Sequence, residues 1–184
     1  NVGVGYETLV ALTDGANNVA IGAQAGAEIA GGDSNIIMGY QAGTNINAGS
    51  NNIVIGWRAA DAANMSNQIA IGYEALGASD GTGMNLALGF YALNKLVKGD
   101  DSTAIGNYAG QYATGSYNTF VGDSAGKGGT TSAPYSSGTS NTAIGYRALI
   151  AFTTGAANIA IGQNAFVSLT TANYGVAIGY DAAQ

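Results

Sequence analysis

The chain has 184 residues, of which 9% are charged, 47% are hydrophobic and 30 are glycine, and its formal net charge is −6. A chain this apolar is expected to fold rather than to form a disordered linker, and its scattered charges make no basic stripe for nucleic acid. It contains no His and no Cys, which excludes disulfides, Ser-His-Asp and Cys-His catalysis and imidazole or thiolate metal sites, and no apolar run is long enough for a membrane span.

A ten-residue pattern recurs from one end of the chain to the other. It reads "NNVAIGAQAG" from residue 17, "SNIIMGYQAG" from 34, "NNIVIGWRAA" from 51 and "SNTAIGYRAL" from 140. Gly5 anchors the first of eleven repeats, which are spaced by 16 or 17 residues except for one interval of 23. The repeats leave no room for a second domain, so we expect a single continuous repeat domain over 1–184. The later anchors are Gly22, Gly39, Gly56, Gly72, Gly89, Gly106, Gly122, Gly145, Gly162 and Gly179.

The repeat predicts a parallel β-solenoid, or β-roll, of about 11 coils. β-branched residues at alternate positions before the anchor indicate a short strand rather than a helix. The glycine is expected to turn the corner, and the "Y-x-A" segment after it is expected to form a second strand. A loop rich in Gly, Asn, Ser and Thr then leads to the next coil. The fold class is therefore all-β, with coils of roughly 17 residues and two short strands in each.

Two columns of the repeat carry structural predictions. Four residues before the anchor stands Asn in eight of the eleven repeats, which is explained either by tolerance of a left-handed turn or by amide ladders along the stack. Three residues after the anchor stands Ala in ten repeats, and we expect these side chains to fill a narrow interior in which a larger residue would overpack. The interior alanines are Ala25, Ala42, Ala59, Ala75, Ala92, Ala109, Ala125, Ala148, Ala165 and Ala182.

The strand before each anchor is apolar on both faces. Side chains alternate along a strand, so its small Ala column and its large Val/Ile column point in opposite directions. One column fills the coil, and the other leaves an apolar stripe longer than soluble monomers tolerate, which predicts self-association. A symmetric homotrimer is the simplest rod that hides one face of each chain. The candidates for its core are Val19, Ile21, Ile53, Ile55, Ile69, Ile71, Ile144, Ile159 and Ile161.

The interval of 23 residues contains an insertion, "KGGTTSAPYSSGTS", over 127–140. Insertions in solenoids lie in surface loops, often on the binding face. The loop is either decorative or a receptor contact. An aromatic residue follows the anchor in seven repeats, where packing along the sheet is preferred over stacking on sugars. The candidate contact residues of the loop are Lys127, Thr130, Pro134, Tyr135 and Ser136.

The repeated "N-x-A-I-G-x-x-A" resembles the head repeat of trimeric autotransporter adhesins, and "NTAIGYRAL", "NTFVGDSAG" and "NNVAIGAQAG" are similar to repeats of bacteriophage tail fibres. The resemblance covers the whole chain, and the tail-fibre match is closer because of the Tyr and the "AG/AL" ending. It implies a left-handed β-roll in which three chains bury their inner strands together. The 17-residue period departs from the shorter coils of the adhesin heads.

Three functions follow as expectations, all of them non-enzymatic and without a cofactor. The first is the shaft or receptor-contacting region of a phage tail fibre that mediates host attachment, the second a bacterial adhesin head, and the third a structural subunit of an extracellular filament. The expected location is extracellular, on a virion or a bacterial surface, and the segment is expected to be an excerpt of a longer fibre. Its expected partners are two further copies of itself and a glycan or protein of the host surface, with no nucleic acid and no membrane insertion.

Overall fold

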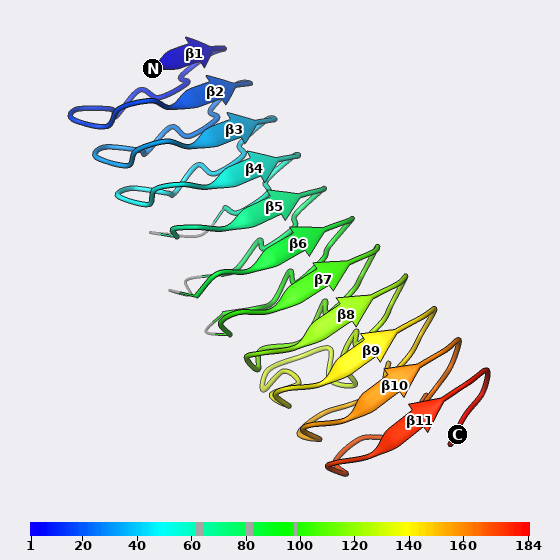
Figure 1. Cartoon of the computed structure of the whole chain (residues 1–184). Helices are drawn as coiled ribbons and strands as arrows, with labels where there is room; N and C mark the ends of the chain where they lie inside the picture. Colours follow the sequence, from blue (N-terminus) through cyan, green and yellow to red (C-terminus); the bar gives the residue numbers. More distant parts are fainter. Residues whose placement is uncertain (62–64, 80–82, 98) are drawn as a thin grey trace.

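The computed structural model describes residues 1–61, 65–79, 83–97 and 99–184, and within them it is a parallel β-solenoid without any helix. Eleven three-residue strands stack in chain order into one sheet, one strand in each coil, so that the molecule is an elongated rod with its termini at opposite ends (Figure 1). The strands are β1 (Val2–Val4), β2 (Val19–Ile21), β3 (Ile36–Met38), β4 (Ile53–Ile55), β5 (Ile69–Ile71), β6 (Leu86–Leu88), β7 (Thr103–Ile105), β8 (Thr119–Val121), β9 (Thr142–Ile144), β10 (Ile159–Ile161) and β11 (Val176–Ile178).

The register keeps each column of the repeat in line along the rod. In β3 and β4, for example, Ile36 lies opposite Ile53 and Met38 opposite Ile55. Backbone bonds at both ends of a strand continue this ladder: the Val19 N–H donates to the Asn35 carbonyl at 2.8 Å, and the Gly22 N–H donates to the Val4 carbonyl at 2.8 Å. The β-solenoid predicted from the 17-residue period is therefore confirmed.

The predicted second strand of each coil is wrong. The segment after each described anchor glycine is a run of turns, because the third residue after the anchor bonds back to it; the Ala25 N–H donates to the Gly22 carbonyl at 3.2 Å. The second and fourth residues after the anchor have positive φ, as at Gln24 (57°) and Leu76 (52°). Bonds between coils hold this unusual backbone in place, since the Gln24 N–H donates to the Tyr6 carbonyl and the Leu76 N–H to that of Ala92.

The anchor glycines occupy a position that no other residue fits. Gly22 has φ of 131°, and a Cβ there would lie 2.6 Å from the carbonyl oxygen of Gly39 in the next coil. The same close approach recurs from coil to coil, for example between Gly106 and the Gly122 carbonyl at 2.5 Å. Glycine is therefore required here both by its left-handed backbone and by the contact between coils.

The interior is formed by the middle residue of each strand and by residues of the following turn, chiefly the third after the anchor. Nine of the ten predicted interior alanines have no exposed surface, and Ala182 in the last coil is partly exposed. In some coils the middle strand position and the fourth position after the anchor compensate each other in size. Phe120 lies against Gly126, where an added Cβ would clash with the ring, whereas the small Ala70 shares its coil with Leu76.

The buried Asn column forms a hydrogen-bonded ladder along the rod. The Asn35 side-chain N–H donates to the Gly49 carbonyl at 2.9 Å, and its Oδ1 accepts from the Asn52 backbone N–H at 3.0 Å. The left-handed residue is the one before it, for example Ser34 (φ 58°). Of the two explanations for this column, the amide ladder is therefore correct.

Candidate functional site

The first and third residues of every strand point away from the interior and form one continuous face of the rod, here called the apolar stripe. Only the middle residue of each strand from β2 to β11 is buried, and both its neighbours are partly or fully exposed. Val176 and Ile178 on β11, for example, are 63% and 67% exposed. With ten spacings of about 4.8 Å and a width of three residues, the stripe covers on the order of 500 Å² in projection.

All nine residues expected in a trimer core lie in the apolar stripe. Ile21, Ile144 and Ile159 are each 38% exposed, and the other six are partly exposed. None of the stripe's outward positions carries a formal charge. The stripe is thus an uncharged surface of regularly spaced side chains, most of them aliphatic.

The aromatic column borders the apolar stripe on the turn side. Trp57, Tyr73 and Phe90 stack in successive coils, with ring centroids 4.7 and 4.9 Å apart. Tyr91 and Tyr108, which stand one position further from their anchors, extend this packing: Tyr91 packs edge-on against Phe90 at 4.5 Å and lies 6.0 Å from Tyr108 in a stacked arrangement. Mutual packing, the preferred interpretation of this column, is what the structure shows in these coils.

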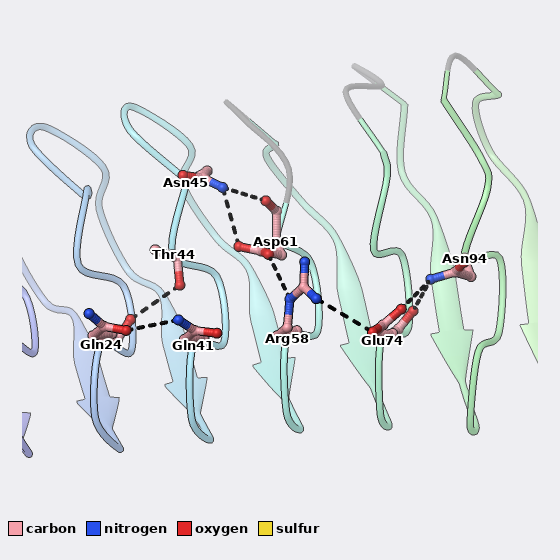
Figure 2. Close-up of polar contacts among 8 residues, drawn as sticks. All are labelled: Gln24, Gln41, Thr44, Asn45, Arg58, Asp61, Glu74 and Asn94. Carbon is pink, nitrogen blue, oxygen red and sulfur yellow. Dashed lines mark hydrogen bonds and ion pairs between the residues drawn. The ribbon is translucent and has the colours of Figure 1, made fainter.

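The second residue after each anchor is mostly polar, as in Gln24, Gln41 and Arg58, and this polar column forms a surface network along the turns. In Figure 2 the side chains of successive coils meet along the rod: the Gln41 amide donates to Gln24 Oε1 at 2.9 Å, and Arg58 lies 3.2 Å from the Asp61 carboxylate and 3.7 Å from that of Glu74. Burial raises the pKa of Asp61, although the Arg58 guanidinium opposes the shift. Because Arg58 is exposed, its ion pairs are screened by solvent and contribute little stability.

The inserted loop lies between β8 and β9 and folds back on the neighbouring coil. Tyr135 stacks on Tyr112 with centroids 6.1 Å apart. The Lys127 ammonium lies 5.0 Å from the ring centre of Tyr108 and 5.9 Å from that of Tyr112. Pro134 is exposed, so the tip of the loop presents an apolar side chain to its surroundings.

A groove of about 420 Å³ opens beside this loop, lined by Val97, Thr114, Ala133, Pro134, Tyr135 and Ser137. Two of the five residues expected to contact a receptor therefore line it. Ser136 is buried instead: its backbone bonds to Thr114 at 2.7 Å and its hydroxyl lies 3.1 Å from that of Thr130. These two hydroxyls hold the loop together.

Sequence reasoning missed the contribution of coils that precede the loop. Tyr112, Val97 and Thr114 come from earlier coils, and their proximity to the insertion depends on how the loop folds back. The one available signal was the column position: Tyr112 stands six residues after its anchor, and Lys127, in the following coil, stands five after its own. That places them side by side on adjacent coils.

Within the part of the chain that the structure describes, no three acidic side chains come together in a way that could hold a metal ion. The described residues also include no helix with the length and apolarity needed to cross a bilayer. Compared with protein-family models, curated proteins and solved structures, the chain matches none.

Proposed function

We propose that this chain is a non-enzymatic segment of an extracellular fibre that self-associates through its apolar stripe into a homotrimer, most simply the shaft or receptor-contacting region of a phage tail fibre. The single observation that supports the proposal most strongly is the stripe itself. It runs over all 11 strands without an interruption by charge.

The size of the stripe favours burial in an assembly. The largest apolar patch on a typical monomer is about 300–600 Å², and the stripe alone reaches the upper part of that range. The aromatic column adjoins the stripe and adds to the exposed apolar area on this side of the rod. A face of this size lies near the limit that monomers expose, which favours its burial against further copies of the chain.

The tail-fibre assignment is supported by two further features, the repeat and the inserted loop. The tail-fibre-like motifs "NTAIGYRAL" and "NTFVGDSAG" flank the loop in sequence, and the loop is the largest departure from the regular coil. We assign host contact to the loop surface around Pro134 and Tyr135. The "N-x-A-I-G-x-x-A" motif supports a bacterial adhesin head as the second candidate, with the same mode of assembly.

Assembly is tested by substituting one residue on each face of the same coil. Ile144 lies in the stripe, whereas Arg147 is exposed on the turn. Sedimentation should give three times the chain mass of 18.2 kDa for the parent and for Arg147→Ala, and one chain mass for Ile144→Asp. Circular dichroism checks that each variant keeps its strands. A stable monomeric parent, or equal effects of the two substitutions, would show that the stripe is not an interface.

Host contact is tested separately with two tyrosines. Tyr135→Ala should weaken binding of the assembled protein to host cells or their surface glycans. Tyr174→Ala is the matched control, because Tyr174 is 84% exposed and lies in the loop before β11. Equal binding of both variants would show that the loop does not contact the host.

A further inference from the structure

The apolar stripe contains one polar interruption, here called the threonine band. It consists of Thr103, Thr119 and Thr142, the first residues of β7, β8 and β9. The three lie in direct register with one another across adjacent strands. The first positions of the strands on either side are aliphatic, as in Leu86 of β6 and Ile159 of β10.

The hydroxyls of the threonine band are available for bonding outside the chain. The three side chains are partly exposed on the stripe. Other threonine hydroxyls bond within the chain, as Thr153 does to the Thr170 carbonyl. In the described part of the chain, the hydroxyls of Thr103, Thr119 and Thr142 make no such bond, and none of them is a fully buried oxygen.

A uniform aliphatic stripe does not fix how two copies are aligned along the rod. Each coil repeats the one before it at about 4.8 Å, so a shift by one coil again places aliphatic side chains against aliphatic side chains. The hydrophobic effect has no direction and changes little on such a shift. The aliphatic side chains alone favour full alignment only through the end coils that a shift leaves uncovered. A polar feature distinguishes one alignment from the next more sharply, as a single polar residue does in a coiled coil.

The threonine band is such a feature. A hydroxyl is both donor and acceptor, so threonines of different copies can satisfy each other. If the copies slip by one coil or more, a threonine on each copy faces an aliphatic side chain, and its hydroxyl is buried without a partner. Equal residues of symmetry-related copies meet at the axis of the assembly, which requires the column of first strand positions to lie nearest that axis.

We propose that the threonine band sets the axial register of the homo-oligomer, with its three levels of threonine meeting across the copies. This inference rests on the proposed function, because it needs copies that associate through the stripe. The partner is a second copy of this chain, and the stripe supplies the attraction while the band supplies the alignment.

The test moves the band. In the shifted variant, Thr103→Val, Thr119→Val and Thr142→Val are combined with Ile36→Thr, Ile53→Thr and Ile69→Thr, which places the band on β3, β4 and β5. A control keeps the native band and carries Ile36→Val, Ile53→Val and Ile69→Val. Each is refolded together with isotopically labelled parent chain, and native mass spectrometry counts pure and mixed oligomers.

The parent should mix freely with the control, and mixed oligomers of parent and shifted variant should be depleted about tenfold, because their bands coincide only when the chains are staggered. Free mixing of parent and shifted variant, with each forming oligomers on its own, would overturn the inference alone. Monomers in every sample would overturn the proposed function and the inference with it.

A second measurement does not depend on how the shifted variant folds. Thr103→Val, Thr119→Val and Thr142→Val without further changes keep the shape of each side chain and erase the band. Solution X-ray scattering should give the parent oligomer the length of one rod, about 50 Å, and the erased variant a greater maximum dimension, through slips of about 4.8 Å per coil. An erased variant with the parent's length would overturn the inference.

Discussion

Replacing Asn141 by Leu tests the buried amide ladder directly. Asn141 is fully buried; its side-chain N–H donates to the Gly155 carbonyl at 2.9 Å, and its Oδ1 accepts from the Asn158 backbone N–H at 3.0 Å. Leu has nearly the same shape and no polar atom. The substitution therefore leaves a buried N–H and a buried carbonyl without these partners. It also removes a bond of 3.1 Å from the Asn158 side-chain amide, which keeps its bond to the Ala172 carbonyl at 2.8 Å. The backbone bonds of the adjoining strands remain.

The expected loss of stability follows from those two groups. An unpaired buried donor or acceptor costs about 1–3 kcal/mol, so Asn141→Leu should lower the free energy of unfolding by roughly 2–6 kcal/mol. That is a large part of the roughly 5–15 kcal/mol typical of a folded protein. Asn173→Leu is the matched control: Asn173 is exposed and accepts one bond from the Ala156 N–H at 2.7 Å, which water replaces. It should cost under about 1 kcal/mol.

Two measurements check this prediction at equal protein concentration. Urea unfolding gives the stability difference, and hydrogen exchange reports the Asn158 amide itself, which should lose its protection in Asn141→Leu and keep it in Asn173→Leu. If Asn141→Leu unfolds at the parent's urea midpoint, or if the Asn158 amide remains protected, the side-chain ladder is not what holds adjacent coils at this column.

Three further predictions concern the interior, the turns and pH. Phe120→Ala should lower the free energy of unfolding by about 3–5 kcal/mol. Gly126→Leu should destabilise the protein less in the Phe120→Ala background than beside the native ring. A double-mutant cycle measured by urea unfolding should show this as a favourable coupling energy. Gly106→Ala should abolish folding of its coil, seen as lost circular dichroism and trypsin resistance, because the added Cβ would lie 2.5 Å from the Gly122 carbonyl oxygen. Burial raises the pKa of Asp61 in the folded state, so its contribution to stability is fully present below its ordinary value of about 3.9 and is lost as pH rises through the folded value. Urea midpoints of the parent should therefore fall over that window relative to those of Asp61→Asn, and parallel midpoints would contradict the shift.

The strand of each coil was predictable because the residue pattern that produces it recurs in every repeat. Alternation in "V-A-I" fixes that Ala20 and Ile21 face opposite sides, and the constant spacing fixes which residues become neighbours. The structure places Ala20 at 0% exposure and Ile21 at 38%. Comparing the repeats along the chain thus showed which strand residues face the interior, which a single three-residue strand does not reveal.

The turn after each strand was not predictable in the same way. Residues such as Gln24, Arg58 and Leu76 adopt positive φ, which non-glycine side chains other than Asn and Asp rarely do. Their conformation is stabilised by backbone hydrogen bonds to the neighbouring coils. Because these bonds join residues about 17 positions apart, the local sequence does not reveal them. Size compensation had only a partial signal. Phe120 departs from the Ala that is usual in its column, whereas Gly126 stands in a column that varies mainly between Gly and Leu. The pairing becomes meaningful only once the two columns are known to touch.

The differences between coils, rather than the repeat, carry any information that this rod presents to a partner. Two differences fall at the same level: Thr119 lies on β8, and the inserted loop with Pro134 and Tyr135 begins six residues after that strand. In an assembly whose register is set by the threonine band, the loops of all copies would lie at one height on the rod. Weak contacts made by each loop would then act together on a host surface, and such linkage raises overall affinity by about 10²–10⁴ without a new contact. A slipped assembly would spread the loops along the rod, so erasing the band should weaken host binding even though no residue of the loop has changed.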